Sequence, residues 1–246
     1  MPLPDSLAGI SWRQPVIFVA ATIICTLLAI YAVVLAPVAV TGVSGLYLAA
    51  AVYVPLALWF GLWGCFAGYL SCVFMGIYLN MPLPFVMVWA LADFFEGFVP
   101  LLIYRSLRTR PVLELKRPKV TYAINGGLMV VLVAAAFALI NSSTWGVLVA
   151  LAASVALVVA QALVEDRKTW LTWLPIGVFI ASLFSAIFGV GAMVAFGQIP
   201  IEVFSTAFFG WVLGDIIVLA TIGTLLTVTF TPLIVKSKIY VRRYLS

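Results

Sequence analysis

The sequence contains no histidine, and its three cysteines show no CxxC spacing. The first absence excludes catalysis by histidine and ligation of metals by imidazole. The second leaves no pattern for a zinc site or a disulfide framework. Walker and Rossmann glycine motifs are absent as well. We therefore expect a protein that is not an enzyme and that uses no cofactor and no metal.

Charged residues are also scarce. They make up 9% of the chain, whereas soluble domains carry about 25%. Apolar runs of roughly 18 residues or more recur from end to end, which is typical of membrane-spanning helices. We expect an all-α, polytopic membrane helix bundle with about eight transmembrane helices, at residues 14–36, 43–60, 61–79, 85–103, 121–140, 145–163, 171–196 and 204–235. Residues 1–246 then form a single membrane domain that leaves no room for a soluble domain.

Basic side chains cluster in one loop and in the C-terminal tail. The loop carries Arg105, Arg108, Arg110, Lys116, Arg117 and Lys119. The tail carries Lys236, Lys238, Arg242 and Arg243. Under the positive-inside rule both segments are cytoplasmic, and with eight spans both termini of this multi-pass protein lie inside a prokaryotic cell. The same rule explains the net charge of +5, so we expect the lipid bilayer as a partner and no nucleic acid.

Residues 43–79 allow an alternative topology. Pro55 interrupts the first half of this stretch, and the connection at residues 60–64 carries no charge. A single span with a re-entrant segment is the alternative to two spans. It would place the N-terminus outside, but the basic loop and the basic tail would still share one side.

Two segments share the pattern W-x-L-small-D, at residues 89–93 and 211–215. Four predicted spans separate them, so both helices run in the same direction. The pattern predicts a parallel internal repeat of the halves 14–104 and 121–236, an arrangement found in transporters. Chance similarity between two apolar helices is the alternative.

Three acids lie inside apolar spans, where an ionised carboxylate costs about 2.5–3.5 kcal/mol and usually marks a functional site. Asp93 and Glu96 share one helix face because they are three residues apart. Trp89 and Trp211 each lie four residues before an aspartate, Asp93 and Asp215. We predict that these five residues bind a small-molecule ligand in one polar cavity between the fourth and eighth spans, open toward the outside.

The carboxyl groups require partners, because two like charges at this separation repel and at least one must be protonated or paired. The sequence offers a few polar partners: Arg105, Gln161, Asn125 and Asn141. An organic cation or a polar ligand that carries amide or hydroxyl groups is a further candidate, and the tryptophan faces would suit an aromatic or cationic ligand. In the alternative interpretation the acids hydrogen-bond Ser, Thr or backbone groups between helices and only fix the packing, with Thr206, Thr221 and Thr224 available on the last span. The tryptophans then belong to the interfacial aromatic belt.

Small residues recur at Ala57, Gly61, Gly64 and Gly68. Such a face lets helix backbones approach closely. It indicates either packing inside the bundle or docking onto another membrane subunit.

Residues 58–69 (LWFGLWGCFAGY) and residues 83–105 resemble the substrate-binding (S) components of energy-coupling factor transporters. The resemblance implies capture of a vitamin-like micronutrient, with a transmembrane coupling subunit and ATPases as partners. The same residues and the late Trp211–Asp215 pattern are similar to membrane-associated sensor (MASE) domains. We therefore expect a small-ligand-binding membrane protein of the S-component type. A stand-alone sensor domain and an ion-coupled secondary carrier are the alternatives.

Overall fold

The computed structural model describes residues 12–35, 46–111, 116–141, 143–165, 170 and 172–245. Every regular element in these ranges is helical, as the long apolar runs predict. The elements are α1 (Arg13–Leu35), α2 (Ala50–Phe60), α3 (Leu62–Tyr78), α4 (Leu83–Trp89), α5 (Leu91–Ser106), α6 (Pro118–Ile140), α7 (Thr144–Val164), η1 (Trp173–Ile180), α9 (Ala181–Ala195), η2 (Ile201–Val203), α10 (Phe204–Val218), η3 (Leu219–Gly223) and α11 (Thr224–Lys236).

These elements group into eight helical passes, one for each predicted segment. Helices α4 and α5 form one pass with a single irregular residue at Ala90. The π-helical segment η1 continues into α9, and α10 continues through the π-helical segment η3 into α11. The main difference in bounds is α2, which begins at Ala50 and not near residue 43.

Two separate helices, α2 and α3, occupy most of the stretch whose topology was open. They meet at Gly61, which has φ 65° and therefore lies in the left-handed region that favours glycine. A Cβ atom at Gly61 would also lie 2.2 Å from the backbone oxygen of Tyr244. The turn thus requires glycine both for its backbone conformation and for its contact with the C-terminal tail.

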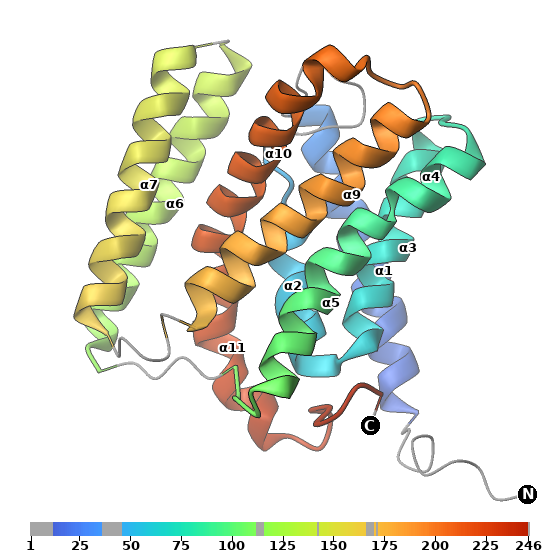
Figure 1. The fold of residues 1–246 in the computed structure, drawn as a ribbon. Coiled ribbons are helices and arrows are strands. Elements are labelled where there is room, and N and C mark those ends of the chain that lie inside the picture. Colours follow the sequence, from blue (N-terminus) through green and yellow to red (C-terminus); the bar gives the residue numbers. More distant parts are fainter. Residues whose placement is uncertain are drawn as a thin grey trace, which may run out of the picture.

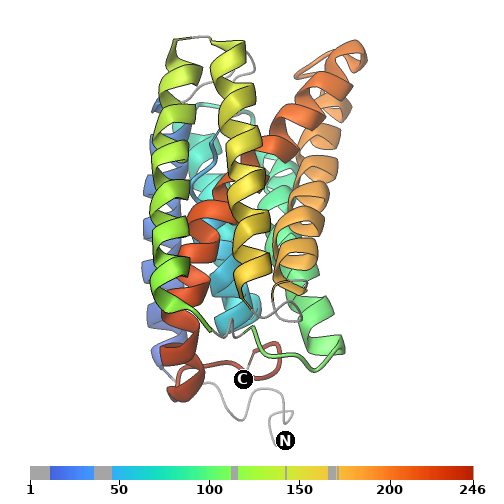
Figure 2. The ribbon, with the colours of Figure 1, turned by 90° about the vertical axis from the view of Figure 1, so that its left-hand side faces the viewer.

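The passes run up and down the long direction of the bundle, and α1 begins at the same end of it at which α11 ends (Figure 1). Helix α9 packs on both α5 and α10, and α2 packs on α3, α5 and η3. Helix α1 covers α3 on the outside. Helices α6 and α7 form an antiparallel pair beside this group. This pair faces the viewer in Figure 2. The centre of the bundle therefore lies among α2, α5, α9 and α10.

The small residues of α2 and α3 are used inside the bundle. A Cβ atom at Gly64 would lie 2.3 Å from the backbone nitrogen of Ala57, and one at Gly68 would lie 2.9 Å from the Tyr53 ring. Gly97 of α5 also approaches this face, because a Cβ atom at Gly97 would lie 3.1 Å from the Cβ atom of Ala57. These small residues are therefore packed inside the bundle, as the first of the two interpretations predicts. They are not available as a docking face for another subunit.

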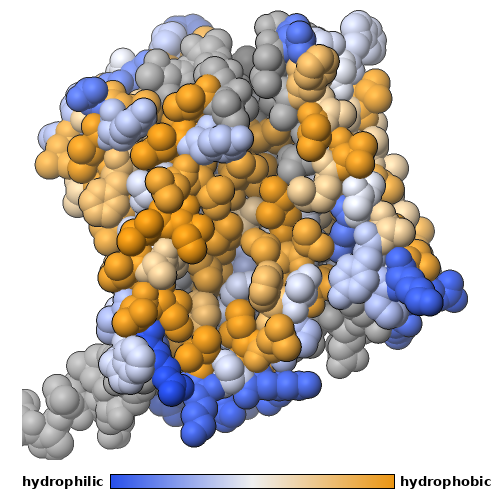
Figure 3. Space-filling view, turned by 180° about the vertical axis from the view of Figure 1, so that it is seen from behind, coloured by the Kyte–Doolittle hydropathy of each residue, from blue (hydrophilic) through white to orange (hydrophobic). Residues whose placement is uncertain are grey.

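Four helical stretches are long and apolar enough to cross a membrane: Arg13–Val34, Leu83–Ser106, Trp173–Ala195 and Ile201–Lys236. Shorter apolar helices are Ala50–Phe60, Leu62–Tyr78 and Leu148–Val164. The exterior is apolar as well. Seen from behind, a broad hydrophobic surface covers the middle of the molecule, and hydrophilic residues gather toward its ends (Figure 3).

The internal repeat stays a prediction. In the first proposed half, α1 packs mainly on α3, whereas in the second half α6 packs mainly on α7. The leading helices of the two halves thus have different neighbours.

Candidate functional site

The three acids that the sequence places within apolar runs lie together in the interior of the bundle. Asp93 and Glu96 project from one face of α5, and Asp215 projects from α10. Their exposed fractions are 1%, 0% and 1%. The i, i+3 spacing on α5 directs both of its acids inward, since residues three apart share a helix face. The structure therefore joins residues that are more than a hundred positions apart into one acid cluster, defined here as Asp93, Glu96 and Asp215.

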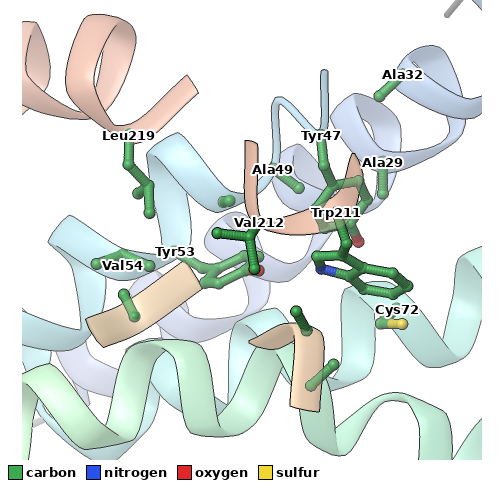
Figure 4. Packing of buried hydrophobic residues seen from close by; sticks show 14 of the residues in the cluster. Ala29, Ala32, Tyr47, Ala49, Tyr53, Val54, Cys72, Trp211, Val212 and Leu219 are labelled. Atoms are coloured by element: carbon green, nitrogen blue, oxygen red, sulfur yellow. The ribbon is translucent and has the colours of Figure 1, made fainter. Parts of the chain in front are cut away.

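Two tyrosines bind the α5 side of the acid cluster. The Tyr47 hydroxyl donates to Oδ2 of Asp93 at 2.8 Å. The Tyr53 hydroxyl donates to Oε2 of Glu96 in a short hydrogen bond. Tyr47 precedes α2 and Tyr53 lies on it, and both rings belong to the same buried hydrophobic core as Trp211 (Figure 4). The phenols thus tie α2 to α5 across the bundle centre.

Helix α9 supplies the hydroxyl between the other two acids. The Ser185 hydroxyl lies close to the carboxyl groups of both Glu96 and Asp215, which also lie close to each other. Its oxygen accepts a hydrogen bond from Nε1 of Trp211 at 2.9 Å. Even so, Oε1 of Glu96 and Oδ2 of Asp215 are buried without a hydrogen-bond partner in the described residues. The cluster is therefore incompletely satisfied.

The described neighbours of the acid cluster include no cation. The groups that interact with its carboxyls are tyrosine, serine and tryptophan side chains and the carboxyls themselves. Buried polar groups normally have partners, and an unpaired one requires an explanation. The arrangement can accept a proton or a positively charged group at the two unpaired oxygens.

The two predicted tryptophans meet at the edge of this cluster. The rings of Trp89 and Trp211 lie 6.2 Å apart in an edge-to-face contact. They are 1% and 8% exposed, so they belong to the core and not to an interfacial belt. Phe85 stacks on Trp89 at 5.5 Å, and Nε1 of Trp89 has no partner in the described residues.

The sequence predictions for this region need two corrections. The fourth and eighth passes do not pack directly along their length, because α9 lies between α5 and α10 and packs on both. The acids also line no open cavity, since their side chains are enclosed almost completely. Contact between the two passes is made by side chains reaching past α9, such as the indoles of Trp89 and Trp211.

The polar partners expected for the acids lie elsewhere. Arg105 binds the C-terminal tail at the end of α5. Gln161 donates to Asn125 at 2.9 Å between α7 and α6, and the Asn141 amide donates to the Phe137 carbonyl. Thr221 bonds to the backbone of its own helix, and the side chain of Thr206 lies outside the described residues. Arg105, Gln161, Asn125, Asn141 and Thr221 are therefore engaged away from the acids, and the expectation for Thr206 stays a prediction.

Sequence reasoning missed Tyr47, Tyr53 and Ser185. One signal was available for the tyrosines, because a phenol within an apolar run usually finds a hydrogen-bond partner when it is buried. Residues 47 and 53 do not share a helical face, however, and Tyr47 precedes the helix. Ser185 gave no signal, because α9 was expected only as a span and not as the helix between the acids.

The cluster does not have the composition of a metal site. Among the described residues, no three His, Cys, Asp or Glu side chains are grouped in a way that could hold a metal ion.

Comparison of the chain with protein-family models, curated proteins and solved structures gives no match. The similarity to S components and to sensor domains therefore stays a prediction from the residues quoted above.

Proposed function

We propose that this is a membrane-embedded protein that binds a small cationic solute at the acid cluster and serves its uptake. The observation that carries the proposal is the burial of Asp93, Glu96 and Asp215 together, with two carboxyl oxygens unpaired and no cation beside them. A buried carboxyl group is stabilised by a proton, by hydrogen bonds or by an opposite charge. A cationic ligand would supply the opposite charge.

Membrane insertion is supported by the four long apolar stretches and by the exposed apolar side chains. The clearest case is α1, where large hydrophobic residues face outward along the whole helix: Val16, Val19, Ile23, Ile24, Leu27, Tyr31 and Val34. A soluble protein rarely exposes so large a contiguous apolar surface. The basic loop and tail at one end would then face the cytoplasm.

The aromatic residues support a cationic ligand of organic type. Trp211 lies beside Asp215 and contacts Trp89, and indole faces attract cations. The unpaired Nε1 of Trp89 is an additional donor for a polar group of the ligand. The acids are enclosed, so entry of a ligand would require α9 or the outer end of α4 to move. Uptake of the S-component type would involve a transmembrane coupling subunit and ATPases as partners.

The test uses the purified protein in lipid nanodiscs and a panel of primary amines and quaternary ammonium compounds. Thermal stabilisation identifies the compounds that bind. Asp215→Asn and Glu96→Gln keep side-chain shape but remove the negative charge, and each should weaken binding by about 2–5 kcal/mol. Glu202→Gln removes an exposed acid on η2 and is the matched control. Unchanged binding in both cluster variants would leave the acids a purely structural role.

A second candidate, an ion-coupled carrier, is favoured by the irregular helices beside the acids. The π-helical segment η3 begins four residues after Asp215, and η1 precedes the helix that carries Ser185. Such π segments occur frequently at functional sites, and transporters place ion sites at discontinuous helices. Proteoliposomes with an imposed pH gradient test this candidate. Proton flux that Glu96→Gln abolishes, without any bound organic cation, would favour the carrier.

A further inference from the structure

A basic cavity is lined by residues from the end of α5, from α11 and from the C-terminal tail. These segments lie at the bottom of the bundle in Figure 1. Its volume is about 280 Å³. Four arginines line it: Arg105, Arg108, Arg110 and Arg242. No acidic residue is among its described lining residues. A small cavity with this charge attracts anions strongly, because each guanidinium group presents several donors in a fixed plane.

The four arginines have different roles. Arg105 is occupied, since it donates to the backbone carbonyls of Leu58, Val241 and Arg243 and to the Tyr240 hydroxyl. It builds the wall of the cavity by fixing the tail against α5. Arg108, Arg110 and Arg242 are exposed, and their guanidinium groups have no hydrogen-bond or ion-pair partner among the described residues. Three free guanidinium groups therefore surround one hollow.

The backbone at Arg108 gives an independent indication. Helix α5 ends in a turn in which the Thr109 amide donates to the Tyr104 carbonyl at 3.0 Å. Arg108 adopts φ 50° in this turn, the left-handed conformation in which glycine is usual. A non-glycine residue there is unfavourable by roughly 1–2 kcal/mol. An arginine at a position that favours glycine indicates that its side chain has a functional role.

We propose that this basic pocket, defined as Arg108, Arg110 and Arg242 with Thr109 and Tyr240, binds a phosphate-bearing anion. Arginine guanidinium groups bind phosphate oxygens in a bidentate manner. Thr109 also lines the cavity, and its hydroxyl donates to the Leu107 carbonyl in a long hydrogen bond of 3.3 Å. A cavity of about 280 Å³ is at the lower end of ligand pockets and suits a phosphate ester or a lipid headgroup. The site is separate from the acid cluster and does not depend on the function proposed for it.

The experiment separates the two sources of phosphate. The full-length protein is placed in nanodiscs of phosphatidylcholine, and pyrophosphate binding is measured by calorimetry. In parallel, thermal stability is compared between these nanodiscs and nanodiscs with an equal share of phosphatidylglycerol. Pyrophosphate binding identifies a soluble anion as the occupant, and stabilisation by phosphatidylglycerol identifies the lipid headgroup.

Arg108→Gly is the informative variant, because it removes the guanidinium group while relieving the left-handed backbone. It should fold at least as well as the parent, yet bind the anion about tenfold more weakly or worse. Arg242→Ala should weaken anion binding similarly. It is the variant to measure if Arg108→Gly does not fold. Lys238→Ala removes an equal charge from the same end, outside the pocket, and should change binding little.

Either pyrophosphate binding or lipid stabilisation that is lost in Arg108→Gly and Arg242→Ala, but kept in Lys238→Ala, supports the proposal. Equal losses in all three variants would show a general charge effect and overturn it. Absence of both pyrophosphate binding and phosphatidylglycerol stabilisation would overturn it as well.

Discussion

Arg105 is expected to be the main attachment of the C-terminal tail to the bundle. Its side chain donates four hydrogen bonds, three of them to backbone carbonyls and one to Tyr240. The tail also bonds directly to the α2–α3 turn, where the Leu62 amide donates to the Tyr244 carbonyl at 2.8 Å. Loss of the guanidinium group should therefore release the tail and loosen this turn.

The magnitude follows from the hydrogen bonds. A hydrogen bond that involves a charged group contributes about 1.5–3 kcal/mol. The four together are discounted because Arg105 is half-exposed and water can replace part of them, so Arg105→Ala should cost about 3–5 kcal/mol. For a protein of this size each kcal/mol lowers the melting temperature by roughly 2–4 °C. Thermal unfolding in detergent should thus show a decrease of roughly 6–20 °C.

Two further variants make the test specific. Arg105→Lys keeps the charge, but an ammonium group cannot reproduce the planar set of donors, so its loss should be intermediate. Arg243→Ala is the control, because Arg243 contributes only its backbone carbonyl to this contact. Limited proteolysis should show faster cleavage of the tail in Arg105→Ala than in Arg243→Ala. Equal stability and equal cleavage in these two variants would refute the assigned role of Arg105.

Three other predictions concern packing, capping and topology. Gly64→Val should separate α2 from α3 and reduce folded yield, because even its Cβ atom would lie 2.3 Å from the Ala57 backbone; normal yield and melting temperature would contradict this. Glu165→Ala should destabilise the protein by about 1–3 kcal/mol, measured by thermal unfolding, since its carboxyl accepts bonds from the start of α6. Cysteines placed at Ser106 and Ser237 should label from the same side of the membrane in cells, and opposite accessibility would exclude an even number of passes between them.

The sequence alone determined the helical fold. Eight apolar segments were predicted, and eight passes are present, because an apolar run of this length can satisfy its backbone only within a helix once it leaves water. The basic residues also placed the loop and the tail at one end, and the structure has them there. Both inferences depend on local composition, which a single sequence contains in full.

The sequence also identified the acids and tryptophans but not their surroundings. Asp93 and Glu96 could be assigned to one face, since helical spacing fixes that relation. The spacing does not indicate which helix packs against that face, however. The sequence predicted direct packing of the fourth and eighth passes, whereas α9, which carries Ser185, packs between them. The tyrosine partners come from a third helical region for the same reason.

The tertiary structure alone decided how polar groups are matched. Arg105, Gln161 and Asn125 were chemically suitable partners for the acids, yet Arg105 binds the C-terminal tail and Gln161 donates to Asn125. Oε1 of Gln161 and Nδ2 of Asn125 have no hydrogen-bond partner among the described residues. The acids are left with phenols, a serine hydroxyl and two unpaired oxygens. Composition specifies which donors and acceptors a chain contains, but the packing of helices far apart in sequence determines which of them meet. The acid cluster and the basic pocket both depend on this packing of distant segments.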